Sequence, residues 1–422
     1  MFKFSSLILA ILSIVLSILI GIVSDNAVWT IVGTLLVSIY VIFLSGLSPT
    51  NPLVWYTFFI NIYHLGICIL YFIGFRSVSN VDGIIIVNAL SILGFLISSL
   101  LIFKRKESFS NMYTVSFSQI SLNLSLVIML LGSLLVPFLF IASGASSKAE
   151  FSNSFGSVFG MLNVVIAMFL VKSEKKPTLI IILLSIYILF VTLLLGERNI
   201  LLSFSILLMI ILYSKFAWSL KRILSITLLL LLLIPILGVY KNIFTRSSFD
   251  GEASTNNSAI IGLLNGEFRS AGYNIERILS SKEQLDYKYG MSIFNDAIRS
   301  VVPGFVYKVE NSISWYNNNY HSAVVAQGRG YGFSLAAEGY INFGYFGVVV
   351  WFVISGLIIN ILYIKSMSSG IYLVVYASTI PVFIYSLRGD FSTIFSPMLK
   401  QVMFTIIFVA LIDSFIKKCA RR

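Results

Sequence analysis

"GRGYGFSLAAEGYINFGYFGVVVWFVISGLIINILYI", residues 328 to 364, passes from a polar, glycine-rich loop into a long apolar run. From residue 334 to residue 364 this run holds one charged side chain, that of Glu338. A helix needs about 20 apolar residues to cross a bilayer. The run therefore predicts a membrane-spanning helix, and it raises the question of why a carboxylate lies near its beginning.

The same kind of run recurs along the whole chain. Of its 422 residues 58% are hydrophobic and 11% are charged, a composition that a soluble fold cannot bury. We therefore predict an all-α polytopic membrane protein with about 12 transmembrane helices. The expected spans cover residues 4–23, 27–47, 53–75, 83–103, 118–142, 153–171, 178–195, 200–214, 223–243, 334–364, 371–387 and 398–416.

One long loop interrupts this pattern, so three parts of one integrated bundle are expected. Nine spans fall within residues 1–243, a large loop covers residues 244–333, and three spans with a tail make up residues 334–422. Within the loop, "SAGYNIERIL" and "GMSIFNDAIRSVVPG" repeat apolar residues at helical spacing, which predicts short helices. The second has an expected apolar face that ends before Pro303, made of Ile293, Phe294, Ala297, Ile298 and Val301.

Lysine and arginine gather in alternate short loops. Basic loops stay in the cytoplasm, so both termini are predicted to be cytoplasmic and the large loop to lie on the outer side. This asymmetry accounts for the net charge of +12 without a nucleic-acid partner. The two cysteines, Cys68 in a span and Cys419 in the tail, predict no disulfide.

Three arginines lie at outer ends of predicted helices: Arg198, Arg329 and Arg388. The guanidinium group stays charged and matches phosphate oxygens better than an ammonium group does. Together they would form a clamp for a diphosphate. The alternative is that each arginine reaches the interface or pairs locally, Arg198 with Glu197 and Arg388 with Asp390.

Two residues are candidates for a general base. Glu338 lies about one turn inside its predicted helix, where burial and charged neighbours tune a carboxylate, and His321 lies in the outer loop. The alternative for Glu338 is a tightly packed helix with a paired carboxylate. Gly339, Gly344 and Gly347 are expected to allow close helix packing in either case.

We expect no metal ion and no cofactor. The closely spaced outer carboxylates Asp250 and Glu252 have no histidine or cysteine cluster beside them. The chain also has no G-x-x-x-x-G-K-[ST] loop for nucleotide hydrolysis. The energy for a reaction would then come from the substrate itself.

Several stretches resemble one family. "GERN" at residues 196–199, "NGEFRSAGYNI" at 265–275, "YKYGMSIFNDAIRSVVPG" at 287–304 and "GFSLAAEGYINFGYFG" at 332–347 are similar to the bacterial oligosaccharide repeat-unit polymerases, the Wzy-type O-antigen polymerases. The similarity extends over residues 190 to 390. It implies a GT-C-like glycosyltransferase architecture in the bacterial inner membrane, with the active site facing the periplasm.

The resemblance also implies a reaction. Such an enzyme transfers a growing glycan from undecaprenyl pyrophosphate to a lipid-linked repeat unit, with membrane lipid around it and a chain-length regulator as a possible partner. The expected catalytic residues are Glu338, His321 and Arg329, and the expected substrate-binding residues are Arg198, Arg388, Arg269, Arg299, Tyr340 and Asn342.

Other functions remain open from the sequence. An O-antigen ligase or an oligosaccharyltransferase would use the same lipid donor with another acceptor. A polysaccharide flippase or other transporter also has about twelve helices, but its charges usually lie at mid-membrane and its loops are short. A non-enzymatic assembly or receptor protein would tolerate the loss of Arg198 or Glu338.

Overall fold

The fold is known from a computed structural model. The residues described are 4–103, 115–143, 156–175, 177–195, 198–219, 221–222, 225, 264–281, 286–302, 306, 310–326 and 330–421. Throughout these ranges the chain forms helices and turns, with no β-strand. The predicted all-α class is confirmed for this part of the chain.

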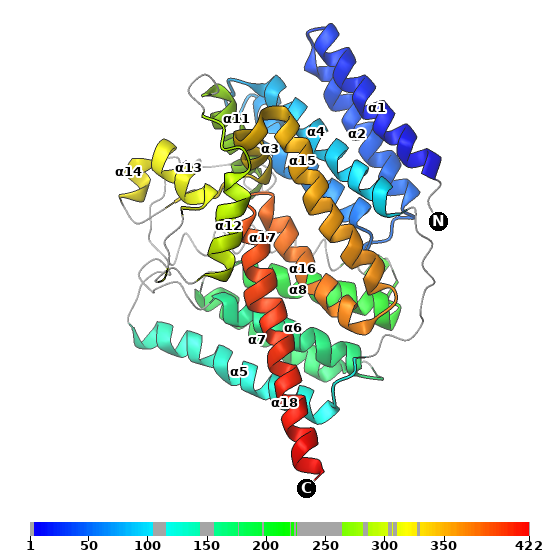
Figure 1. The fold of residues 1–422 in the computed structure, drawn as a ribbon, viewed down its shortest axis with the longest axis vertical. Helices are drawn as coiled ribbons and strands as arrows, with labels where there is room; N and C mark the ends of the chain where they lie inside the picture. The colour runs from blue at the N-terminus through cyan, green and yellow to red at the C-terminus, as the bar shows by residue number, and fades with distance from the viewer. Residues whose placement is uncertain are drawn as a thin grey trace. The chain divides into compact units, whose positions relative to one another are not determined.

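The helices follow the apolar runs of the sequence (Figure 1). They are α1 (Phe4–Val23), α2 (Ala27–Leu44), α3 (Pro52–Phe72), α4 (Val81–Ile102), α5 (Gln119–Ala142), α6 (Gly156–Lys172), α7 (Thr178–Leu195), α8 (Arg198–Phe216), α11 (Arg269–Ser280), α12 (Met291–Val301), α13 (Ser312–Tyr320), α14 (Ser322–Val325), α15 (Leu335–Ser366), α16 (Gly370–Ser386), α17 (Ser392–Pro397) and α18 (Phe404–Ala420). π-Helical turns at Leu264–Phe268 and Met398–Met403 precede α11 and α18.

Eleven of the expected spans contain an apolar helix. Within the described ranges nine helices are long and apolar enough to cross a membrane, and α6 and α16 are shorter apolar helices. The expected span at 223–243 lies outside the described residues, apart from Ser225. A multi-pass membrane protein is therefore confirmed, while the count of twelve spans stays a prediction.

The contacts between helices divide the chain into two compact units. The first contains residues 1–107, 258–364 and 383–395, and the second contains residues 108–257, 365–382 and 396–422. The described part of the large loop thus belongs to the same unit as α1 to α4. The division into three consecutive parts stays a prediction.

Asparagine side chains begin three consecutive helices of the first unit. Asn26, Asn51 and Asn80 each accept a hydrogen bond from an N–H group in the first turn of α2, α3 and α4, at 2.9, 3.0 and 2.9 Å. Such caps satisfy N–H groups that have no partner inside the helix. The polar residue between two apolar runs therefore defines where each helix begins.

The core of the first unit is aromatic. Tyr56 on α3 is fully buried, and its ring centroid lies 5.0 Å from that of Phe95, 6.2 Å from that of Phe352 and 6.5 Å from that of Phe383.

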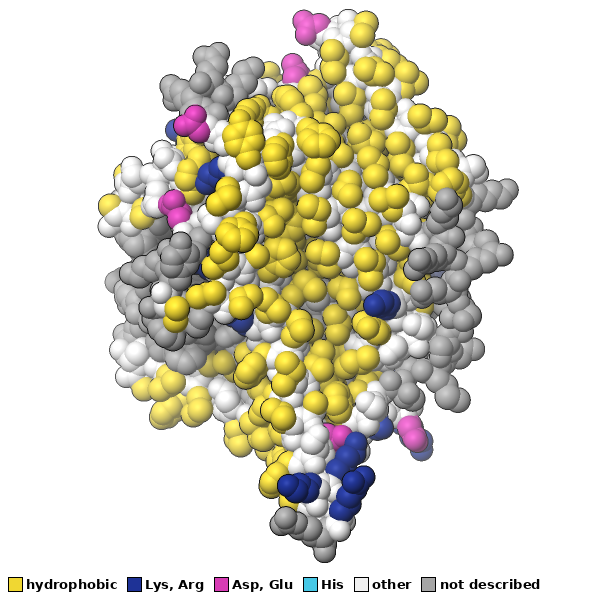
Figure 2. All heavy atoms as spheres, viewed as in Figure 1, with side chains coloured by type: hydrophobic (Ala, Val, Ile, Leu, Met, Phe, Trp, Pro, Cys, Tyr) yellow, Lys and Arg dark blue, Asp and Glu magenta, His cyan; other side chains and the backbone are white. Residues whose placement is uncertain are grey.

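The helices α1 and α2, in contrast, expose many apolar side chains, which Figure 2 shows in yellow. Exposed apolar side chains on such long helices are expected where lipid surrounds them.

Glycines let α11 approach α3 closely. A Cβ atom at Gly272 would lie 2.6 Å from the carbonyl oxygen of His64 and 2.5 Å from a methyl carbon of Ile67. A Cβ atom at Gly66 would lie 2.8 Å from the carbonyl oxygen of Phe268. The helix predicted from "SAGYNIERIL" therefore exists, and it is packed directly against a membrane-spanning helix.

The helix α12 buries its polar side. The helix forms where its sequence predicted, but it buries Ser292, Asp296 and Ser300. Its apolar side points outward, with Phe294 58% exposed and Val301 69% exposed. The sequence predicts the helix and its apolar face but not the burial of its polar side, which joins a buried hydrogen-bond network described below.

The helix α15 is broken near its start. Phe343 and Gly344 leave the helical conformation, and Gly344 has φ of +61°, a value that glycine adopts without strain. Figure 1 shows the resulting bend. A Cβ atom at Gly339 would lie 2.8 Å from the carbonyl oxygen of Gly347, so the two pieces touch through glycine. The span predicted over 334–364 is therefore present, but it consists of two helical pieces.

The second unit has its own buried carboxylate. Asp413 on α18 accepts hydrogen bonds from the Ser118 N–H at 2.9 Å and from the Ser121 hydroxyl at 3.0 Å, and it forms a 2.6 Å ion pair with Lys417. Figure 2 shows basic side chains gathered around the end of α18. Asp413 is thus a carboxylate with a cationic partner.

Candidate active site

Glu338 lies in the first turn of α15 and is fully buried. Its Oε1 atom accepts hydrogen bonds from the Ser292 hydroxyl at 2.7 Å and from the Ser312 hydroxyl at 3.2 Å. Its Oε2 atom accepts the N–H group of Phe391 at 2.8 Å. Residues from α12, α13 and the turn before α17 therefore hold one carboxylate at the start of α15.

Two more buried carboxylates lie beside it. Ser392 joins them, because its N–H group donates to Asp296 Oδ2 at 3.0 Å and its hydroxyl donates to Asp390 Oδ1 at 2.6 Å. We call Asp296, Glu338 and Asp390 the carboxylate cluster. Of these three carboxylates, the sequence predicts only Glu338 as a site residue, and it offers Asp390 as a local partner of Arg388.

The Asp390 carboxylate accepts hydrogen bonds from residues at the starts of two helices. Its Oδ2 atom accepts from the Asn311 amide at 2.9 Å and from the Ile313 N–H at 3.1 Å, at the start of α13. Its Oδ1 atom also accepts from the Thr393 N–H at 3.2 Å, at the start of α17. N–H groups at helix starts carry partial positive charge and stabilise an anion. Asp390 therefore ties two helices to the site.

The cluster is electrostatically crowded. Burial raises the pKa of Asp296, and the neighbouring carboxylates of Glu338 and Asp390 contribute to this rise. Burial also raises the pKa of Asp390, although its hydrogen bonds oppose the shift. Carboxylates that share a site do not all ionise together near neutral pH.

Two cations face the cluster. Lys288 is half-buried, with its Nζ atom 3.8 Å from the ring centroid of Trp315, and burial lowers its pKa to about 8 despite the nearby carboxylates of Glu310, Glu338 and Asp296. The exposed Arg299 lies near enough to Asp390 to favour its ionised form. Arg299 was expected at the site, whereas Lys288 was missed. The signal available for Lys288 was its place within "YKYG".

His321 lies away from the cluster. Its Nε2 atom is 3.1 Å from the Tyr316 hydroxyl, and its ring centroid is 4.5 Å from that of Tyr331. Burial lowers its pKa, and Arg277 adds to this effect. Ser312, which contacts Glu338, and His321 lie at opposite ends of α13, roughly 13 Å apart along the helix. The structure thus separates the two candidate bases.

Arg388 follows α16, and its guanidinium carbon lies 5.1 Å from the ring centroid of Tyr385. Its carbonyl oxygen accepts the Phe333 N–H at 3.1 Å, and a Cβ atom at Gly332 would lie 2.7 Å from that oxygen. The glycine-rich stretch is therefore joined to the turn that carries Arg388. Arg329 and the side chain of Arg198 lie outside what the structure describes, so the convergence of three arginines stays a prediction.

Arg269 lies in a second group of basic side chains, together with Arg76. Its Nη1 atom donates to Asn265 Oδ1 at 3.1 Å, and Arg76 donates to the same oxygen through Nε at 3.1 Å. Arg269 also lies 6.0 Å from the ring centroid of Tyr273. Arg269 is among the predicted substrate-binding residues, whereas Arg76, which follows α3, is not.

Asn342 and Tyr340 lie on the N-terminal piece of α15, before the break at Phe343 and Gly344. The Asn342 amide donates to the Ser292 hydroxyl and to the Glu338 carbonyl oxygen, both at 2.7 Å, and it accepts the Gly290 N–H at 2.8 Å. Tyr340 is buried with its ring centroid 5.2 Å from that of Tyr345. Asn342 therefore connects α12 to the carboxylate cluster.

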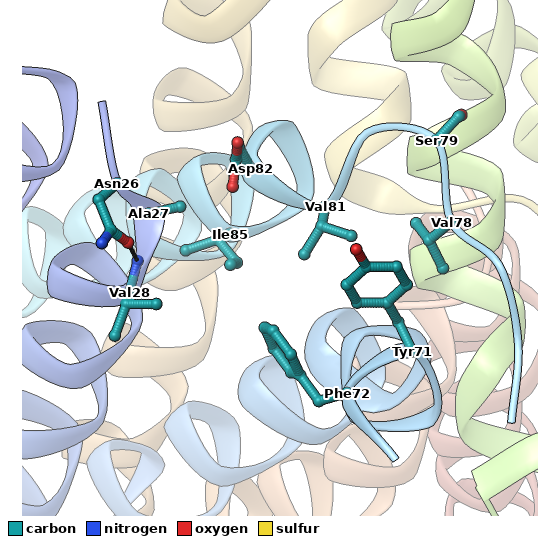
Figure 3. Close-up of a pocket in the computed structure, with 10 residues that line it drawn as sticks. All are labelled: Asn26, Ala27, Val28, Tyr71, Phe72, Val78, Ser79, Val81, Asp82 and Ile85. Carbon is teal, nitrogen blue, oxygen red and sulfur yellow. Dashed lines mark hydrogen bonds between the residues drawn. The ribbon is translucent and has the colours of Figure 1, made fainter. Parts of the chain in front are cut away.

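In the described part of the chain, no group of metal-binding side chains coincides with the carboxylate cluster, and a cavity lies away from it. Among the residues described, no group of three or more histidine, cysteine, aspartate or glutamate side chains is arranged to hold a metal ion. Asp250 and Glu252 lie outside those residues. A cavity of about 290 Å³ lies beside the start of α2, the end of α3 and the start of α4, with Tyr71 and Phe72 opposite Asn26 (Figure 3). None of its lining residues belongs to the predicted site.

Comparison with known proteins identifies a family for this chain. The family model described as O-antigen polysaccharide polymerase Wzy matches residues 2–419, which is nearly the whole chain. No curated protein and no solved structure matches this sequence.

Proposed function

Because the chain belongs to the O-antigen polysaccharide polymerase Wzy family, whose members are glycosyltransferase-type polymerases acting on lipid-linked oligosaccharide repeat units, we propose that the carboxylate cluster is its chemical centre. There a growing glycan is transferred from undecaprenyl pyrophosphate to a sugar hydroxyl of a second lipid-linked unit. The observation that carries this proposal is the burial of Glu338 at the mouth of α15 among donors from three other segments.

In the proposed transfer step, Glu338 receives the proton of the acceptor hydroxyl. The acceptor hydroxyl oxygen bonds to the anomeric carbon, the bond from that carbon to the diphosphate oxygen breaks, and the diphosphate leaves with the electron pair. Glu338 takes the hydroxyl proton as a general base. Of its hydrogen bonds, the one from Ser312 is the longest at 3.2 Å, and an acceptor hydroxyl would replace it.

The leaving diphosphate needs positive charge as it departs. Arg388 lies two residues before Asp390, so its backbone is already part of the site, and Arg198 and Arg329 are proposed to join it. Preorganised guanidinium groups would stabilise the developing charge without a metal ion. Arg269, Arg299 and Tyr340 are proposed to bind the rest of the substrate.

The proposed setting is the bacterial inner membrane with a GT-C-like arrangement, both termini in the cytoplasm and the cluster facing the periplasm. The distribution of basic loops supports this orientation. Tags at residues 106, 174 and 420 should react only after the membrane is opened, while a tag at residue 255 should react in intact spheroplasts. Protection of the tag at 255 would reverse the proposed orientation.

The role of Glu338 is tested with purified enzyme and lipid-linked repeat units. Glu338→Gln should insert normally and lose about 10²- to 10⁴-fold in turnover. Glu276→Gln is the matched control, since Glu276 lies on α11, outside the cluster, and accepts hydrogen bonds from Ser79. An active Glu338→Gln variant beside an inactive His321→Ala variant would move the base to His321.

Metal independence and acceptor choice are tested in the same assay. Turnover should persist in EDTA, and loss of turnover that a divalent ion restores would refute a metal-free step. A ladder of lipid-linked products identifies a polymerase. Transfer to a non-polymer acceptor would identify a ligase or an oligosaccharyltransferase. In cells, a changed ladder length on co-expression of a chain-length regulator would identify that partner.

The arginine proposal is tested by charge-conserving changes. Arg198→Lys, Arg329→Lys and Arg388→Lys should each lower turnover about tenfold or more, since lysine lacks the forked donor geometry. Arg421→Lys in the C-terminal tail is the control. Unchanged ladders from all three variants would remove the clamp from the mechanism.

A further inference from the structure

Asp296 differs from the other two members of the carboxylate cluster. Every oxygen of Glu338 and Asp390 accepts at least one hydrogen bond from an N–H or hydroxyl group. Asp296 accepts one at Oδ2, from the Ser392 N–H at 3.0 Å. Its Oδ1 atom is buried, and no donor among the described residues reaches it.

The side chains of Asp296 and Glu338 are held next to each other. Two features produce this approach. Phe391 and Ser392 are consecutive, and their N–H groups bind Glu338 and Asp296 respectively. Ser292 and Asp296 are one turn apart on α12, and Ser292 also binds Glu338. Two carboxylate oxygens both accept hydrogen bonds, so they bind each other only if one carries a proton.

We propose that Asp296 is a positioning residue that holds a proton and donates it in a hydrogen bond to Glu338, so that the two carboxyl groups carry one negative charge between them. This arrangement supplies the buried Oδ1 atom with a partner. The role of the pair in glycan transfer rests on the proposed function of Glu338, whereas the shared proton does not.

The surrounding charges favour this state. The groups that face Asp296 and its neighbours are Glu338 from α15, Asp390 from the turn before α17, Lys288 before α12, Glu310 before α13, and Arg299, which faces Asp390. Carboxylates outnumber cations in this set. Burial with the neighbouring Glu338 and Asp390 raises the pKa of Asp296, which agrees with a proton there.

During transfer each proton has a defined place. Glu338 takes the proton of the acceptor hydroxyl as the new bond to the anomeric carbon forms and the bond to diphosphate breaks. Asp296 keeps its own proton and holds the Glu338 carboxylate in orientation through the hydrogen bond. Asp296 therefore acts through Glu338 and has no contact with the substrate in this scheme.

Infrared difference spectroscopy of the purified full-length protein tests the proton directly. At neutral pH, wild type minus Asp296→Asn should show the carbonyl stretch of a protonated carboxylic acid, shifted in D₂O. Asp413→Asn is the matched control, because Asp413 is a buried aspartate paired with Lys417 and should remove no such band. Absence of the band from the Asp296 difference spectrum would overturn the proposal.

Turnover provides the second test. An asparagine at position 296 still donates to Glu338 and accepts from Ser392, so Asp296→Asn should lose less turnover than Asp296→Ala, which should lose about tenfold or more. The wild-type rate should fall at alkaline pH as the pair loses its proton, and Asp296→Asn should lack that fall. Equal losses in both variants with an unchanged pH profile would mean an ionised Asp296.

The two proposals fail separately. A carbonyl band at Asp296 together with full activity of Glu338→Gln would leave the shared proton standing and remove Glu338 as the base. An inactive Glu338→Gln variant with no carbonyl band would keep the base and remove the shared proton.

Discussion

The helices α11 and α12 come from the same loop, but α11 buries a mainly apolar side and α12 buries a polar side. In α11 the buried side is mainly apolar and packs against α3 and α4, while Arg277 is exposed. In α12 the buried side is polar, and Phe294 and Val301 are exposed. The buried residues of α11 are Ala271, Gly272, Asn274, Ile275, Ile278 and Leu279.

The difference shows that the opposing surface decides which face is buried. The surface opposite α11 is apolar and carries Gly66, so close packing gives the larger gain. The surface opposite α12 carries Glu338 and Asn342, each of which would lose one hydrogen bond without Ser292. Burial of polar groups is favourable only when hydrogen bonds are satisfied, and α12 supplies them.

The largest expected difference between the two helices comes from their apolar residues. Ile278→Ala on α11 should lower the free energy of unfolding by about 2 to 5 kcal/mol, because Ile278 is fully buried. Phe294→Ala on α12 should change it by less than about 1 kcal/mol, because that side chain is 58% exposed. Thermal unfolding in detergent measures both. Equal losses would mean that the apolar side of α12 is also buried.

On α12 the buried serines, rather than the apolar residues, should contribute to the free energy of unfolding. Ser292→Ala removes a hydroxyl that binds ionisable Glu338 and accepts from Asn342, which should cost about 1.5 to 3 kcal/mol. Ser300→Ala is the control on the same face, because the Ser300 hydroxyl donates only within α12, to the Asp296 carbonyl oxygen. Denaturant unfolding of both variants makes the measurement. A Ser300→Ala loss as large as that of Ser292→Ala would contradict a specific role for the network.

Glycine packing should affect α11 to a smaller extent. Gly272→Ala places a Cβ atom 2.6 Å from a backbone oxygen of α3, and such overpacking costs about 1 to 3 kcal/mol. Gly132→Ala on α5 is the matched control, since nothing lies within 4 Å of the added atom. Melting temperatures should fall for the first variant and stay or rise for the second. A neutral Gly272→Ala would show that α11 shifts without cost.

The smallest expected effect concerns pH. Burial lowers the pKa of Lys288 from 10.5 to about 8, so between these values the unfolded chain binds more protons than the folded one. The stability of wild type should therefore rise with pH in this window relative to Lys288→Met, by less than about 1 kcal/mol because the side chain is half exposed. Lys288→Arg, charged throughout, should also lack the rise. Parallel stability curves for wild type and both variants would contradict the shift.

The sequence predicts the local features of this protein well. Apolar runs located the described spans, Pro303 marked the end of α12, and Glu338 lies one turn into its helix as expected. These features depend on neighbouring residues. The hydrogen bond from Ser392 to Asp296 joins residues 96 apart, and no local pattern reports such a distance. The same limit explains why Lys288 was missed.

The break in α15 was missed for a related reason. Residues around Gly344 are apolar on both sides, so the run looks like one span until the contact between Gly339 and Gly347 is known. Only folding back of the chain reveals that contact. The burial of the polar side of α12 likewise depends on Glu338, which lies 46 residues after Ser292.

The contact between Gly339 and Gly347 has a consequence for comparing related sequences. A methyl group at either position meets the backbone of the other, and a smaller partner cannot relieve this because both are already glycine. The two positions are therefore constrained together, and they stand one and nine residues after Glu338. In divergent chains, the spacing E-G-x7-G would align the carboxylate where overall identity has been lost.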